Sequence, residues 1–235
     1  MTVDELLARV RAEMHARADE DFRRGVVNFF VEPVNPHGVR SPDVKAIARI
    51  AHAEVKRWPA AQRLRFANEL WKSGRLEEGS LAIVIYRRLA KQAGAAEFAV
   101  FERWLDRYVH NWANCDGVAS WLLAGAIANE PELIARLRPW AASKNRWKRR
   151  AAIVAMLQEA KQGRNTAAIF ELADALLRDP DQMVQKGVGW VLKQTYPKRP
   201  RELMAFLLPR AAQAPRLVLR IAAEKMSAPD RAVLL

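Results

Sequence analysis

Apolar residues recur at helical spacing along almost the whole chain, and the alternation that marks a β-strand is nearly absent. Proline or glycine interrupts this periodicity at short intervals, so the sequence predicts many short helices joined by tight connections. The breaks fall at Pro59, Gly74, Gly94, Pro131, Gly163, Pro180, Pro197 and Pro215. The expected helices are 3–18, 22–30, 42–57, 60–73, 77–93, 96–110, 114–129, 131–142, 146–161, 165–178, 181–195, 199–213 and 216–226. This pattern is typical of an all-α protein.

A weak internal repeat indicates how these helices are arranged. Trp112, Trp147 and Met183 each lie near the start of an expected helix, and they are about 35 residues apart. Each of these helices is followed by a turn and a second helix, which is the organisation of HEAT-like repeats. Because one pair cannot bury its apolar face alone, the sequence predicts helical pairs stacked into a curved α-solenoid, a single domain over residues 1–235. The alternative is a non-repetitive helical bundle.

The formal net charge is +13, which favours an acidic partner because like charges repel one another in the folded state. DNA, RNA and anionic membranes are the candidates, and a basic surface without a partner is the alternative. No run of about 18 apolar residues is present, so no membrane-spanning helix is expected. The N-terminus lacks the pattern of a signal peptide, and the single cysteine, Cys115, excludes an internal disulfide and a cysteine-based zinc site. A cytoplasmic nucleic-acid-binding protein fits best.

Two basic stretches, 143–150 and 193–201, fall at expected helix junctions. Junctions on one edge of a solenoid come into register, so these charges would form a stripe able to follow a phosphate backbone. One charge run is usually a solvated surface, but two runs at related repeat positions favour DNA binding. The residues expected to contact DNA are Trp147, Lys148, Arg149, Lys186, Lys198 and Arg199.

A candidate catalytic set comes from three stacked repeats. Trp112 and Asp116 are four residues apart, so on a helix they share one face. If the repeats stack, Arg150 and Trp190 would reach the same inner surface. Each tryptophan taken alone is more typical of a core residue, and Asp116 alone of an ion-pair partner.

A carboxylate in a basic groove repels DNA, and it makes sense if the reaction develops positive charge. Cleavage of an N-glycosidic bond does so, because the sugar becomes oxocarbenium-like as the base departs. Asp116 could stabilise that cation and activate a water molecule, while tryptophan faces pack against the sugar. Arg150 could hold a phosphate or pair with Asp116.

At these residues the chain resembles the AlkD-like HEAT-repeat family of DNA alkylpurine glycosylases. The matching segments run in order along most of the chain, and they are weak only before Pro42. They are Gly38-Val39-Arg40-Ser41-Pro42, Glu69-Leu70-Trp71 with Glu77-Glu78, Asn111-Trp112 with Asp116, Trp147 with Arg150-Ala151-Ala152-Ile153, and Val184-Gln185-Lys186-Gly187 with Gly189-Trp190-Val191-Leu192.

The resemblance implies hydrolytic release of cationic 3- and 7-alkylpurines from double-stranded DNA, without metal or cofactor. It implies that Asp116 is the catalytic carboxylate, that Trp112 and Trp190 contact the deoxyribose of the lesion, and that Arg150 lies beside them. A monomer in the cytoplasm, associated with the nucleoid, is expected.

Two other interpretations remain open, and two more are disfavoured. One is a catalytically silent HEAT-repeat module that binds structured or damaged nucleic acid, which would lack Asp116 or both tryptophans. Another is a protein-binding scaffold, which would carry mixed charge rather than a basic edge. A cysteine hydrolase is disfavoured because Cys115 is typical of a small buried residue and His110 lies more than one helical turn away. A helix-hairpin-helix glycosylase is also disfavoured, because the sequence contains no glycine-rich hairpin of the kind that such enzymes require.

Overall fold

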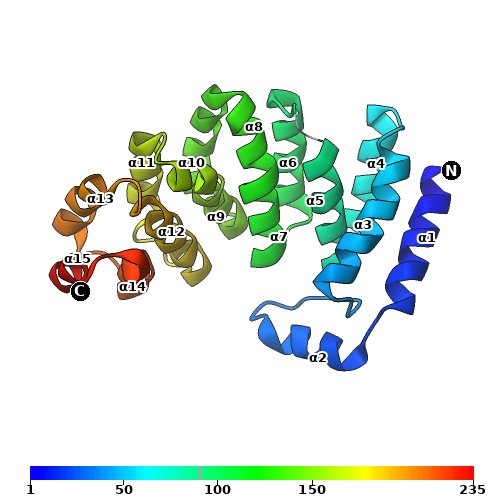
Figure 1. Ribbon diagram of the computed structural model, residues 1–235, viewed down its shortest axis with the longest axis horizontal. Helices are drawn as coiled ribbons and strands as arrows, with labels where there is room; N and C mark the ends of the chain where they lie inside the picture. The colour runs from blue at the N-terminus through cyan, green and yellow to red at the C-terminus, as the bar shows by residue number, and fades with distance from the viewer. Residues whose placement is uncertain (90–91) are drawn as a thin grey trace.

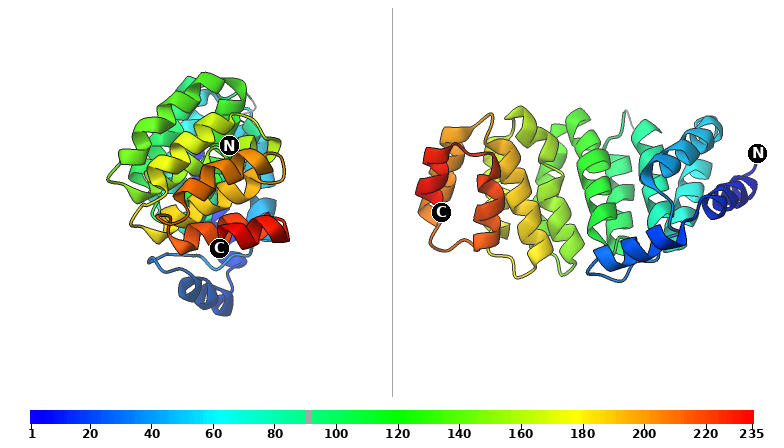
Figure 2. Two further views of the ribbon diagram at one scale, coloured as in Figure 1. Left: turned by 90° about the vertical axis from the view of Figure 1, so that its left-hand side faces the viewer. Right: turned by 60° about the horizontal axis from the view of Figure 1, so that its bottom comes forward.

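The computed structural model describes residues 1–89 and 92–235, and in these residues it is helical without a named strand. The helices stand side by side from one end of the molecule to the other and form an arch (Figures 1 and 2). The predicted all-α class and the stack of helical pairs are therefore confirmed.

The N-terminal half of the chain, up to Arg107, contains six α-helices in its described residues. They are α1 (Val3–Ala16), α2 (Glu20–Phe29), α3 (Ser41–Val55), α4 (Ala60–Lys72), α5 (Leu76–Leu89) and α6 (Ala95–Arg107). A long central helix follows, composed of α7 (Trp112–Gly117), a π-helical segment (Val118–Leu123) and α8 (Ala124–Asn129).

The C-terminal half begins with a 3₁₀ helix, Pro131–Ala142, which contains Pro139. It continues with α9 (Arg146–Val154), α10 (Leu157–Gln162), α11 (Thr166–Leu176), α12 (Gln182–Thr195), α13 (Pro200–Leu207), the short 3₁₀ turn Leu208–Arg210, α14 (Arg216–Ala222), the 3₁₀ turn Ala223–Lys225 and α15 (Ala228–Leu234).

Two layers of helices build the arch. Successive packing contacts join α1, α3, α5, α7, α9, α12 and α14 into one continuous layer, which we call the inner layer of the arch. On the other side lie α4, α6, the 3₁₀ helix Pro131–Ala142, α11 and α13, which fill the second position of each pair. The buried apolar side chains form one cluster that extends from Val3 to Leu234. α2 buries no side chain fully and stands apart from both layers (Figure 1).

The expected breaks mostly fall where the helices end, and the differences have local causes. Gly74 and Gly163 have φ of +66°, the left-handed conformation that glycine adopts without strain at a helix end. The expected helix 131–142 is 3₁₀ rather than α, and Pro139 has no N–H to donate inside it. The expected helix 146–161 is interrupted by a turn at residues 155–156, and α15 was not expected. The end of the expected helix 77–93 overlaps residues 90–91, which lie outside the described residues.

Candidate functional site

Asp116 and Trp112 are carried by α7, whose start is fixed by a side-chain cap. The Asn111 side chain accepts a hydrogen bond from the backbone N–H of Asn114 at 2.9 Å, and Asn111 is buried. Such a cap satisfies one of the free N–H groups at a helix start and typically contributes about 1 kcal/mol. α7 therefore begins at Trp112, two residues before the expected start, and its first turns carry both candidate residues on one face.

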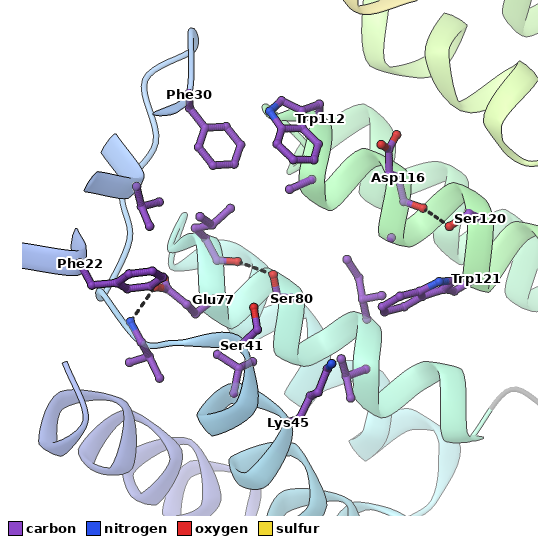
Figure 3. Close-up of a pocket in the computed structure, with 18 of the residues that line it drawn as sticks. Phe22, Phe30, Ser41, Lys45, Glu77, Ser80, Trp112, Asp116, Ser120 and Trp121 are labelled. Atoms are coloured by element: carbon purple, nitrogen blue, oxygen red, sulfur yellow. Dashed lines mark hydrogen bonds between the residues drawn. The ribbon is translucent and has the colours of Figure 1, made fainter. Parts of the chain in front are cut away.

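A pocket of about 470 Å³ lies over this face of α7. Its walls come from α2, α3, α5, α7, the π-helical segment and α12, and Figure 3 shows most of the lining side chains. Trp112, Asp116 and Trp190 all line it, together with apolar side chains such as Val44 and Ile83. The structure thus brings three of the sequence-predicted site residues to one cavity. Such an apolar pocket with a few polar groups is the usual form of a ligand site.

The Asp116 carboxylate is held by Arg150 in a bidentate ion pair. The Nε atom donates to Oδ1 and an Nη atom to Oδ2, both at 2.8 Å. The side chains are 15% and 7% exposed, so the pair is largely shielded from solvent. Burial raises the pKa of Asp116, and the hydrogen bonds and charge of Arg150 oppose this rise. A carboxylate that accepts on both oxygens acts in its ionised form.

Arg150 is positioned by the packing of α9 against α12. Burial lowers its pKa and the ion pair with Asp116 raises it more, so the net shift is upward. A further Nη atom donates to the backbone carbonyl of Met183 at the start of α12. Gly187 allows this approach, because a Cβ there would lie 3.3 Å from the Arg150 Cγ atom. The geometry therefore makes Arg150 a partner of Asp116, which was one of its two expected roles.

The segment after α2 covers part of the pocket. The Phe30 ring stacks on Trp112, with ring centroids 5.2 Å apart and an interplanar angle of 18° (Figure 3). Phe22 and Val26 also line the pocket. None of the site residues expected from the sequence lies in this region, although residues 22, 26 and 30 are spaced four apart, as residues on one face of a helix are.

An ion pair joins the same segment to the start of α9. Glu32 accepts a hydrogen bond from an Nη atom of Arg146 at 2.7 Å, and the other Nη atom of Arg146 contacts Asp181 at 3.0 Å. The Glu32 side chain is 9% exposed, and its second oxygen is buried without a hydrogen-bond partner. The contact spans 114 positions in the sequence, so no local pattern could reveal it.

Two buried glutamates at the start of α5 anchor the loop between α2 and α3. Glu77 accepts hydrogen bonds from the backbone N–H groups of His37, Gly38 and Val39 at 2.8 to 3.0 Å. Glu78 accepts from Arg11 and lies 3.0 Å from the Nε2 atom of His37. Burial raises the pKa of Glu78, but His37 and Arg11 lower it more, so the net shift is downward. Glu77 and Glu78 are among the residues on which the family resemblance rests, and in the structure they hold the loop between α2 and α3 in place.

The residues expected to contact DNA lie in different environments. Trp147 is 5% exposed. Lys148 pairs with Glu102 and Asp106, Arg149 with Asp179, and Arg199 with Glu202 and the Gly163 carbonyl. Lys186 and Lys198 are exposed and have no ion pair in the described part of the chain. A role of these six residues in DNA binding stays a prediction, and the paired ones would have to exchange carboxylates for phosphates.

Cys115 is fully buried, and its Sγ atom lies 3.3 Å from the carbonyl oxygen of Trp147. Burial raises the pKa of the thiol, and the neighbouring Asp116 raises it further, so the thiolate is disfavoured. The expectation of a small buried cysteine is confirmed. In residues 1–89 and 92–235, no cluster of three or more His, Cys, Asp or Glu side chains could hold a metal ion. No helix in the same residues combines the length and apolar character needed to cross a bilayer.

Together, the curved stack and its pocket define a class of protein: an α-solenoid whose pocket is lined by an arginine-paired carboxylate and two tryptophans. The sequence model of the DNA alkylation repair enzyme family matches residues 10–226. The chain belongs to this family, and its role is in the repair of alkylated DNA.

Comparison of the fold gives a similar result. A solved structure described as a predicted DNA alkylation repair enzyme from Enterococcus faecalis superposes with a TM-score of 0.81 and 14% sequence identity. The match covers 90% of this chain and 98% of that chain, so the two share the fold over most of this chain. A search of the curated proteins found no match.

Proposed function

We propose that the protein is a DNA glycosylase that hydrolyses the N-glycosidic bond of cationic 3- and 7-alkylpurines in double-stranded DNA, in the base excision repair of alkylation damage. The observation that carries this proposal is the ion-paired Asp116 carboxylate in a pocket that Trp112 and Trp190 also line. Membership of the family supports it.

The chemistry of the lesion suits such a site. The bond between C1′ and the purine nitrogen breaks, its electron pair leaves with the cationic base, and the base departs neutral. The sugar develops positive charge, which a nearby carboxylate stabilises by electrostatic attraction. Water then adds to C1′ and loses a proton, which Asp116 can accept. A leaving group that is already cationic needs no acid to protonate it, so the proposed reaction requires neither metal nor cofactor.

The tryptophans and Arg150 have supporting roles in this mechanism. The faces of Trp112 and Trp190 attract positive charge and offer flat surfaces for the deoxyribose. Arg150 is a positioning residue: its bidentate contact fixes both carboxylate oxygens at 2.8 Å and keeps Asp116 ionised. Because the carboxylate is largely shielded from water, its interaction with a sugar cation is stronger than it would be in solution.

We further infer that the protein acts as a monomer on DNA of the cytoplasmic nucleoid. The formal net charge of +13 supports a polyanionic partner. Exposed cations such as Lys186 and Lys198 would contribute to binding without base specificity.

A second candidate is a catalytically silent module that binds structured or damaged nucleic acid. One observation favours it: the Phe30 ring stacks on Trp112 and covers part of the aromatic surface proposed for the sugar. For catalysis, Phe30 has to move away or share the ring with the substrate.

Release of free bases from methylated duplex DNA distinguishes the two candidates. The duplex is incubated with excess protein and the released bases are separated by chromatography, with a protein-free reaction to correct for spontaneous depurination. A glycosylase releases 7-methylguanine and 3-methyladenine above that background. A silent module binds the same duplex and releases none, which would refute the proposed activity.

A further inference from the structure

A second, larger depression continues from the Asp116 pocket along the inner layer. It has a volume of about 650 Å³ and shares Lys45, Val84 and Trp121 with the first pocket. Figure 3 shows Lys45 and Trp121 at the side of the pocket away from Phe30. The lining side chains come from α3, α5 and the π-helical segment: Lys45, Arg49, His52, Val84, Arg87, Arg88 and Trp121.

Four cations in this depression have no ion-pair partner among the residues that the structure describes. Lys45 and Arg49 lie one turn apart on α3, and Arg87 and Arg88 lie in the last turn of α5. All four are exposed, and none makes an ion pair or a side-chain hydrogen bond in the described part of the chain. No Asp or Glu is among the described lining residues. Like charges gathered in this way destabilise the free protein and attract anions. We call these four residues the basic shelf.

The local field of the shelf acts on a neighbouring histidine. Burial lowers the pKa of His52, and the positive charges of Arg88 and Lys56 lower it further. His52 is therefore disfavoured as a cation, and the net charge of the shelf comes from its lysine and arginines.

Trp121 links the shelf to the candidate catalytic pocket. In a regular α-helix a residue five positions after Asp116 would point about 140° away from it, since each residue turns about 100°. The π-helical segment Val118–Leu123 widens the turn, so that Asp116 and Trp121 line the same cavity (Figure 3). Trp121 is 37% exposed, which is high for a large aromatic side chain.

Arg87 is already oriented by Trp121. Its Cζ atom lies 4.5 Å from the centroid of the indole ring, in a cation–π contact. The contact restrains the side chain and leaves the N–H groups at the edge of the guanidinium free. A phosphate group accepts two parallel hydrogen bonds from such an edge.

From these observations we infer that the basic shelf is a binding site for the phosphodiester backbone of DNA beside the lesion. This inference rests on the proposed function in one respect only, which is that DNA is the ligand. A phosphodiester strand suits the shelf because it carries several negative charges in succession, and the shelf gathers four cations from two neighbouring helices, α3 and α5. The site is recessed in the inner layer of a curved molecule, which favours a strand over the flat surface of a membrane.

Two variants of equal net charge test this site. The shelf variant carries Lys45→Gln, Arg49→Gln, Arg87→Gln and Arg88→Gln. The control variant carries Arg9→Gln, Arg103→Gln, Arg107→Gln and Lys161→Gln, which replace exposed cations that have no ion pair in the described residues, line neither depression and lie outside the two basic stretches. Each variant loses four positive charges, so the formal net charge falls from +13 to +9 in both. Affinity for an undamaged duplex is measured by fluorescence anisotropy at several salt concentrations.

The shelf variant should lose about 3 to 4 from the slope of log K against log salt concentration, because each phosphate contact contributes about 0.9. Its dissociation constant should rise at least about tenfold at low salt. The control variant should change the slope by less than about 1. Equal slopes in the two variants would overturn the site, as would shelf-dependent binding to anionic lipid vesicles without binding to DNA. If the fourfold variant does not fold, Arg49→Gln and Arg87→Gln are tested singly, each with an expected slope change of about 1.

The site and the proposed function fail in different ways. If the shelf variant loses affinity for DNA but the wild-type protein releases no alkylated base, the shelf stands and the glycosylase proposal is wrong. If the wild-type protein releases base and the shelf variant keeps wild-type affinity and salt dependence, the glycosylase stands and the shelf proposal is wrong.

Discussion

Replacing Asp116 by Asn removes the charge of the carboxylate and keeps its shape. The remaining amide oxygen can accept only one of the two Arg150 hydrogen bonds, both of which are now 2.8 Å long. Arg150 keeps its charge, so it is left buried and only partly compensated. Removing one partner of a buried ion pair typically costs about 3–5 kcal/mol, and we expect about 3 kcal/mol because one hydrogen bond survives.

The same substitution should slow the chemical step. Loss of the stabilising charge should reduce release of 7-methylguanine by about one to three orders of magnitude, which corresponds to about 1.4–4 kcal/mol in the activation barrier. Affinity for DNA should stay the same or rise, because a negative charge is removed from the groove. The rate is measured in single turnover with saturating protein, at a temperature where circular dichroism shows the variant to be folded.

A matched control separates the loss of rate from the loss of stability. Asp179 forms the same kind of bidentate pair with Arg149, at 2.6 and 3.1 Å, and its side chain is 5% exposed. It does not line the pocket. Asp179→Asn should therefore destabilise the protein to a similar extent and keep the single-turnover rate. The mechanism is refuted if Asp116→Asn retains the wild-type rate, or if both variants lose the same factor.

Three further predictions concern the same site. Trp112→Ala and Trp190→Ala should each slow single-turnover base release less than Asp116→Asn does, because an aromatic face carries no full charge; a larger loss in either would contradict the assigned roles. The rate of base release should fall as the pH falls through the pKa of Asp116, because the ionised carboxylate is the active form. Since burial raises this pKa, the fall should begin at a higher pH than for an ordinary aspartate. A pH–rate profile corrected for spontaneous depurination should show this step in the wild-type protein, and Asp116→Asn should lack it. Glu32→Gln should release one Nη atom of Arg146, while Asp181 still holds the other, and should strengthen duplex binding by about two- to fivefold, or about 0.4–1 kcal/mol. Unchanged or weaker binding in an anisotropy titration would contradict a contact between Arg146 and the DNA.

The sequence by itself determined the fold class and the core of the candidate site. Helical periodicity and short breaks define where helices form, because each depends on residues only a few positions apart. Trp112 and Asp116 could be assigned to one helical face for the same reason, and the repeat of about 35 residues carried Arg150 and Trp190 to the same surface.

Only the tertiary structure decided which charges are free. The basic stretch at 143–150 is conspicuous in the sequence, yet Lys148 and Arg149 are neutralised by carboxylates from α6 and from the turn before α12. The unpaired cations of the shelf come from two helices and form no run in the sequence. The carboxylates that pair with Lys148 and Arg149 lie 30 or more positions away in the sequence, and local patterns do not encode contacts at that separation.

The cover of the pocket is also a tertiary feature. The Phe30 contact with Trp112 and the Glu32 pair with Arg146 join α2 and its following loop to repeats far along the chain. The π-helical segment that turns Trp121 toward Asp116 is likewise invisible in the sequence, because one extra residue in a turn leaves the apolar pattern nearly intact. Local periodicity sets the helices, and the packing between them sets what each side chain meets.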